Sequence, residues 1–142
     1  MLFRSFGNRS LLADPRGPDI KDRVNAIKQR QEFRPFAPMV LEEHADDIFN
    51  LISNDHRYMQ YTVHCKYPEL YPAIIHKDGT SRVQTVGPKD DLRVRRLLEV
   101  WYERTGCPML LNTSLNIKGQ PMVNNLQDAF AFEYHYGVKF FN

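Results

Sequence analysis

The sequence predicts a mixed α/β (α+β) fold, in which a single twisted sheet is flanked by helices. Apolar residues recur with helical spacing around 20–27 and 92–101, whereas short apolar or β-branched runs such as 109–111 are typical of strands. No internal repeat, low-complexity tract or linker interrupts the 142 residues. We therefore expect residues 1–142 to form one domain.

In the first half of the chain we expect a short extended or helical piece at 11–13, a helix at about 19–27 and a strand at 39–41. A second helix is expected at 45–52 and a second strand at 58–65. Ile20, Val24 and Ile27 make one apolar stripe, which favours the first helix. Asp19 is a plausible N-cap for it. The Pro-rich segment 33–38 cannot be helical, because each proline favours extended geometry in the residue before it.

In the second half we expect a β-hairpin at 73–86, a helix at about 91–105 and a buried strand at 109–111. A further helix is expected at 126–136 and an edge strand at 138–141. The hairpin turn is expected at 77–80, where Asp-Gly is a common turn pair. Asp90 or Asp91 opens the helix, and Gly106 followed by Pro108 ends it.

The fold is expected to be organised around residues 107–116, where an apolar run breaks into Asn-Thr-Ser-x-Asn. Amides and hydroxyls would then stand at the carboxyl end of a buried strand, where ligands bind in open α/β sheets. The alternative is a strand that runs into an ordinary Asn/Ser turn. The basic residues elsewhere in the chain favour a ligand site, because they need an anionic partner.

Composition excludes several classes of protein. The chain is 42% hydrophobic and 25% charged, with a net charge of +2. Its apolar runs are too short for a transmembrane helix, and its start lacks the apolar core of a signal peptide. The charge is too small for general binding to nucleic acid, so specific binding to DNA is not expected. Two cysteines, Cys65 and Cys107, fit buried free thiols in a reducing cytoplasm.

Four clusters combine basic and neutral polar residues, namely 7–10, then Lys28-x-Arg30 with Arg34, then 76–82, and finally Asn112, Ser114 and Asn116 with Lys118 just beyond. Arginine grips phosphate or carboxylate with a planar fork, and lysine supplies a compact charge. Serine and asparagine provide neutral donors that fix orientation. Each cluster alone also fits a solvated surface or a turn, so only their combination indicates an anion site.

Other chemistries have weaker support. The sequence contains neither of the glycine-rich phosphate loops, Gly-x-x-x-x-Gly-Lys-Ser/Thr or Gly-x-Gly-x-x-Gly. The histidines and cysteines show no spacing typical of metal ligands, so no protein metal site is expected. No serine or cysteine stands in a neighbourhood that distinguishes a nucleophile.

In chain order, the four clusters resemble motifs of the NodU/CmcH carbamoyltransferases. Residues 6–16 (FGNRSLLADPR) resemble the family's LGNRSILADPR segment, and residues 28–38 (KQRQEFRPFAP) resemble KxRxxFRPFAP. Residues 76–86 (HKDGTSRVQTV) resemble HVDGTARVQTV, and residues 106–116 (GCPMLLNTSLN) resemble GxPVLLNTSFN. The four motifs span most of the chain.

The resemblance implies the C-terminal domain of that family, with a fold like the YrdC-type adenylate-forming domains. It also implies synthesis of carbamoyl-adenylate from carbamoyl phosphate and ATP with Mg²⁺. In the family, an actin-like N-terminal domain then transfers the carbamoyl group to a hydroxyl of a sugar or antibiotic. This sequence does not include that domain, so we expect either a split protein whose actin-like domain lies on another chain or a fragment of a longer chain.

The resemblance assigns roles by motif match. Lys28 and Arg30 would neutralise phosphate charge, while Arg34 and Arg82 would hold the oxygens of carbamoyl phosphate or carbamate. The neutral side chains of Asn112, Ser114 and Asn116 would orient the nucleotide. Arg9 and Ser10 of the first cluster would close the site around it. Two alternatives are a nucleotide- or RNA-binding module without catalysis and an inert remnant.

Overall fold

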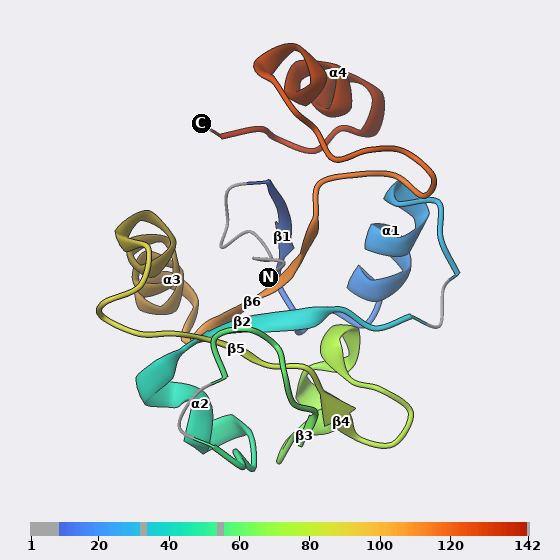
Figure 1. Ribbon diagram of the computed structural model, residues 1–142. Coiled ribbons are helices and arrows are strands. Elements are labelled where there is room, and N and C mark those ends of the chain that lie inside the picture. Colours follow the sequence, from blue (N-terminus) through green and yellow to red (C-terminus); the bar gives the residue numbers. More distant parts are fainter. Residues whose placement is uncertain (1–8, 32–33, 54–55, 142) are drawn as a thin grey trace.

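A four-stranded mixed sheet forms the centre of the computed structural model, which describes residues 9–31, 34–53 and 56–141 (Figure 1). Its strands, in spatial order, are β1 (Ser10–Ala13), β6 (Met109–Ser114), β2 (Ala37–Leu41) and β5 (Gln84–Val86). Strand β6 is antiparallel to both of its neighbours, whereas β2 and β5 are parallel. The predicted mixed α/β class is confirmed, and the likeness to YrdC-type domains stays a prediction.

Alternation of side chains along the strands gives the sheet two apolar faces. One face packs against α3 (Leu92–Thr105), through a buried cluster of Met39, Leu41, Val86, Val94, Leu98 and Leu110. The other face belongs to a larger core that includes Leu11, Val40, Val83, Met109 and Leu111, with α1 (Ile20–Ile27) packed against it. Consecutive residues of β2 and of β6 thus enter different cores, which fixes the register of both strands.

The helices end where local chemistry permits. Helix α3 begins at Asp91, whose carboxylate accepts the backbone N–H groups of Arg93 and Val94, and ends at Gly106 with a φ of 68°. Helix α4 (Leu126–Tyr136) begins at Asn125 and ends at Gly137 in the same left-handed conformation. The predicted bounds of α1, α3 and α4 are confirmed within a residue or two. None of the described helices is both long and apolar enough to cross a membrane.

The predicted hairpin at 73–86 is wrong. The turn itself forms, because Asp78 Oδ1 accepts the backbone N–H of Thr80 at 3.0 Å and Gly79 adopts a φ of 79°. Pro72, however, begins a short 3₁₀ helix, η2 (Pro72–Ile74), on the side where a strand was expected. Strand β4 (Thr80–Ser81) therefore pairs with β3 (Val63–His64) in a second small sheet, and β5 pairs with β2 instead.

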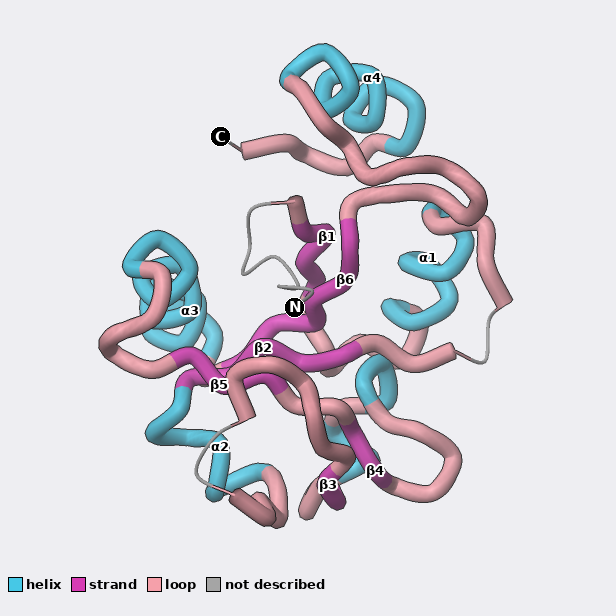
Figure 2. Tube along the Cα trace, viewed as in Figure 1, coloured by secondary structure: helices cyan, strands magenta, loops and turns pink. Residues whose placement is uncertain are grey.

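Three smaller differences separate the structure from the predicted elements (Figure 2). Helix α2 (Glu42–Ile48) starts directly after β2, earlier than 45–52, and the strand expected at 58–65 is reduced to β3. A second 3₁₀ helix, η1 (Pro68–Leu70), follows it. Residues 138–141 form no strand, and the Phe140 ring instead lies edge-on against Phe130 of α4, with centroids 5.7 Å apart.

Both cysteines are buried free thiols, as predicted. Burial is the main cause that raises the pKa of Cys65 and of Cys107 above the ordinary value. A raised pKa leaves little thiolate at neutral pH, and the thiolate is the reactive form. The two thiols therefore act as small apolar side chains in the core.

Candidate functional site

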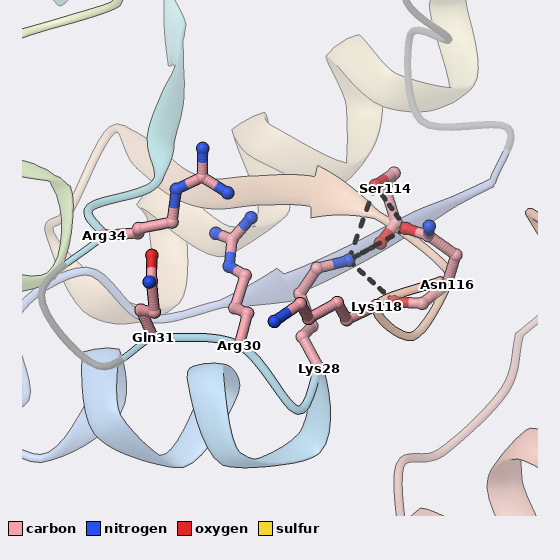
Figure 3. Close-up of a pocket in the computed structure, with 7 residues that line it drawn as sticks. All are labelled: Lys28, Arg30, Gln31, Arg34, Ser114, Asn116 and Lys118. Carbon is pink, nitrogen blue, oxygen red and sulfur yellow. Dashed lines mark hydrogen bonds between the residues drawn. The ribbon is translucent and has the colours of Figure 1, made fainter. Parts of the chain in front are cut away.

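A cationic pocket of about 250 Å³ lies where the end of α1, the loop that leads to β2 and the end of β6 meet (Figure 3). We call it the cationic pocket, and its lining residues are Lys28, Arg30, Gln31, Arg34, Ser114, Asn116 and Lys118. It unites the second and fourth sequence clusters, which are more than 80 residues apart along the chain. Four of its seven lining residues are cations, so the pocket is suited to an anion.

The ammonium group of Lys28 is buried and surrounded by oxygens of the β6 end. The side chain is only 4% exposed, and its Nζ donates to the backbone oxygen of Ser114 and, at 2.8 Å, to that of Asn116. It also donates to Asn116 Oδ1 at 3.1 Å, and the Ser114 hydroxyl donates to the same oxygen at 2.6 Å. Lys28 therefore fixes the shape of the turn after β6.

Arg30 is held in place by two contacts. Its Nε donates to Asn25 Oδ1 at 2.8 Å, and its guanidinium carbon lies 4.3 Å from the centre of the Phe36 ring. Asn25 is fully buried in α1, and its Nδ2 also donates to the backbone oxygen of Arg34 at 3.1 Å. One buried amide thus positions both arginines of the pocket.

Within the described parts of the chain, no carboxylate balances the positive charge of the cationic pocket. Figure 3 shows the guanidinium groups of Arg30 and Arg34 on the same side of the pocket, with the Lys118 chain reaching toward them. Burial first, and then the charge of Arg34, lower the pKa of Arg30. Among the residues that the structure describes, no carboxylate lies within 4.0 Å of the charged groups of Arg30, Arg34 or Lys118. An anionic ligand would relieve this repulsion.

The stability of the protein should depend on pH through Lys28. Burial, reinforced by the charge of Arg30, lowers the pKa of Lys28 from 10.5 to about 8. Between these values the unfolded chain binds more protons at this group than the folded chain, so the free energy of unfolding rises with pH. We expect the stability of the wild type relative to Lys28→Met, measured by urea denaturation, to increase from pH 8 to pH 10.5. A constant difference would show that Lys28 titrates alike in both states.

The structure brings five of the nine predicted site residues into the cationic pocket, namely Lys28, Arg30, Arg34, Ser114 and Asn116. Ser10 pairs with Ser114 across β1 and β6, and the backbone oxygen of Arg9 accepts the N–H of Leu115 at 2.8 Å. These two residues therefore adjoin the pocket through their backbone. The part of the first cluster before Arg9 lies outside the described residues.

Asn112 and Arg82 do not line the cationic pocket. Asn112 is buried, and its Nδ2 donates to Gln84 Oε1 at 3.0 Å across β2, while its own Oδ1 accepts no hydrogen bond from any described residue. Arg82 precedes β5, and its Nη2 donates to the backbone oxygen of Met59 at 3.3 Å. The roles assigned to these two residues stay predictions.

Two lining residues were not assigned a role from the sequence. Lys118 stands two residues after Asn116 and was noted only as a neighbour of that cluster, while Gln31 gave no signal. The backbone N–H of Lys118 donates to the backbone oxygen of Lys28 at 3.0 Å, which brings the turn after β6 onto the end of α1. No group of three or more metal-ligating side chains occurs within the described parts of the chain.

Comparison with known proteins identifies relatives of this chain. Residues 3–141 match the family model described as carbamoyltransferase C-terminus. The chain is 41% identical to nodulation protein NolO of Bradyrhizobium diazoefficiens over 133 residues, which are 90% of this chain and 24% of the relative. It is 43% identical to nodulation protein NolNO of Sinorhizobium fredii, over 89% of this chain and 19% of that protein.

A third relative has a name that states a reaction. The 3'-hydroxymethylcephem-O-carbamoyltransferase of Amycolatopsis lactamdurans is 38% identical over 91% of this chain and 25% of its own length. The chain thus spans a fifth to a quarter of the length of these relatives. Together with the family match over almost all of the sequence, these similarities show that the chain belongs to the carbamoyltransferase C-terminus family.

Proposed function

We propose that the chain forms carbamoyl-adenylate from carbamoyl phosphate and ATP, as the activating half of an O-carbamoyltransferase. The observation that carries this proposal is the cationic pocket, where Arg30, Arg34 and Lys118 lack described carboxylate partners. Both substrates are rich in phosphate. Arginine forks and a lysine charge are the groups that bind phosphate best.

The reaction needs positioning and charge stabilisation more than covalent help from the protein. Hydrolysis of carbamoyl phosphate releases phosphate and leaves carbamate. A carbamate oxygen then displaces pyrophosphate from the α-phosphorus of ATP. Arg30 and Arg34 would stabilise the negative charge that spreads over the phosphoryl oxygens.

Phosphate fits the lining of the cationic pocket better than a bare metal ion does. The described lining residues include no Asp or Glu, and carboxylates are the usual protein ligands of Mg²⁺. We propose that Mg²⁺ enters with ATP and is held by its phosphate oxygens. The metal would neutralise part of the phosphate charge, while Arg30, Arg34 and Lys118 would bind the remaining charge.

The acceptor of the carbamoyl group is proposed to be a hydroxyl of a sugar or antibiotic-like molecule. The name of the Amycolatopsis relative supports this chemistry, since it describes O-carbamoylation of a hydroxymethyl group. The relatives are four to five times as long as the matched segment, which leaves room for a separate acceptor domain. We propose an actin-like domain in that role.

ATP–pyrophosphate exchange tests the proposal directly. We expect exchange that depends on carbamoyl phosphate and Mg²⁺, and calorimetry should show that ATP and carbamoyl phosphate bind more tightly together than singly. Failure to bind either compound would contradict the proposal. RNA binding that weakens steeply with salt, without exchange, would instead support a non-catalytic binding module.

Arg82→Ala is expected to abolish the exchange reaction and to leave the fold intact. Arg82 is exposed, and its one described side-chain contact is the 3.3 Å hydrogen bond to Met59, so its loss should hardly change stability. The reaction would suffer because Arg82 is proposed to hold the oxygens of carbamoyl phosphate or carbamate. Arg104→Ala, an exposed change in the last turn of α3, is the control. Unchanged exchange in Arg82→Ala would remove this residue from the site.

A further inference from the structure

A second hollow adjoins the cationic pocket, and we call it the α4 groove. It has a volume of about 450 Å³ and lies between the loop 116–123 and helix α4. Phe132, Val123 and Met122 give it apolar walls, and Phe132 is tightly packed at 8% exposure. Gln120 and His135 add polar groups to the lining. A hollow with apolar walls and a few polar groups is suited to a planar organic ligand.

Asn116 is shared by the cationic pocket and the α4 groove. Its Oδ1 accepts from Lys28 and Ser114, as described above. Its Nδ2 is directed to the other side, where it donates to the backbone oxygen of Gln120 at 3.2 Å. The two hollows thus meet at the Asn116 side chain, so a single extended ligand that passes it can occupy both.

The size of the cationic pocket argues that a nucleotide extends beyond it. Its volume of about 250 Å³ lies below the roughly 300–1,000 Å³ that small-molecule sites occupy. Together with the α4 groove the volume falls inside that range. A third hollow, lined by His56 and Thr85 among others, has no lining residue in common with the cationic pocket. The α4 groove is therefore the better continuation.

We propose that the α4 groove holds the adenosine part of ATP while the phosphates lie in the cationic pocket. The inference rests on the proposed function, because it assumes that ATP binds there. The base would pack on Phe132 and Val123, and Gln120 and His135 would be available for hydrogen bonds. Stacking and apolar contacts of this kind contribute about 1–3 kcal/mol per base in other proteins, so ATP should bind at least several-fold more tightly than tripolyphosphate.

Filling the groove tests the proposal. Ala131 is exposed on α4 and lines the groove, so Ala131→Leu should obstruct it without disturbing the core. Gln127→Leu, on the same helix but outside the lining, is the matched control. Calorimetry with ATP and with tripolyphosphate should show about a tenfold loss of ATP affinity in Ala131→Leu and unchanged tripolyphosphate affinity. Gln127→Leu should bind both as the wild type does.

The outcomes separate this inference from the function on which it rests. Equal affinity of the wild type for ATP and tripolyphosphate would overturn the groove assignment while the cationic pocket stands. Undiminished ATP affinity in Ala131→Leu would overturn it as well. Binding of neither compound to the wild type would contradict the proposed function, and the groove assignment with it. Circular dichroism spectra of both variants, compared with that of the wild type, serve as the control for folding.

Discussion

Arg30→Ala is expected to weaken tripolyphosphate binding by about 10- to 100-fold, because a charge-assisted hydrogen bond contributes roughly 1.5–3 kcal/mol. The effect should be large because Arg30 is oriented before a ligand arrives, by Asn25 and by the Phe36 ring. None of the described residues accepts a hydrogen bond from the two terminal nitrogens of Arg30, which can therefore bind a phosphate. ATP–pyrophosphate exchange should fall at least as much, since charge builds up at the phosphoryl group during the reaction.

Arg23→Ala is the matched control for Arg30→Ala. Arg23 lies on α1, the helix that precedes the loop carrying Arg30, and forms an exposed ion pair with Asp19 at 3.6 Å, away from the cationic pocket. The Arg23→Ala variant should therefore bind tripolyphosphate as the wild type does. Arg30→Lys adds a finer test, because lysine keeps the charge but loses the planar fork. An equal loss of affinity in Arg23→Ala and Arg30→Ala would show that only the net charge of the protein matters. It would contradict the proposal that Arg30 binds phosphate directly.

Lys28→Met is expected to lower the free energy of unfolding by about 2–4 kcal/mol at pH 7. Methionine preserves the approximate volume of the side chain, so the cost comes from oxygens of Ser114 and Asn116 that lose their donor. Each buried acceptor left without a partner costs roughly 1–3 kcal/mol. The variant no longer has the desolvation cost of a buried ammonium, which offsets part of this sum. Urea denaturation, followed by the fluorescence of Trp101, measures the change.

Lys118→Met separates the structural role of Lys28 from a charge effect. Lys118 lines the same pocket, yet its side chain is exposed and its charged group has no carboxylate partner among the described residues. Its replacement should reduce anion affinity and leave the stability nearly unchanged. A Lys28→Met variant that is as stable as the wild type would show that the contacts of the buried ammonium do not stabilise the fold.

Local patterns were sufficient to predict helices α1, α3 and α4. The apolar stripe of α1 and the capping residues Asp91 and Gly106 of α3 act within a few residues, so the sequence reveals them directly. Strand partners depend on contacts between distant segments. The turn at Gly79 forms as predicted, but the choice of β3 for β4 and of β2 for β5 depends on packing that no local pattern encodes.

The candidate site was predictable to a similar degree. Lys28-x-Arg30 and Ser114-x-Asn116 indicated an anion site, and the structure brings the two motifs together. Asn112 shows the limit of such reasoning. It has the same polarity as Ser114, yet its side chain bonds to Gln84, whose strand was not known to lie across β2. Polarity marks candidates, and the strand order decides which of them reach the pocket.

The position of β6 between two antiparallel partners has a thermodynamic consequence for binding. The strand pairs with β2 over Met109–Asn112 and with β1 over Leu111–Ser114, so the segment that ends in Ser114 is anchored more firmly than a surface loop would be. A ligand that meets this end finds the donors already arranged. The entropy lost on association is then mainly that of the ligand, because little of this segment has to be ordered when the ligand binds.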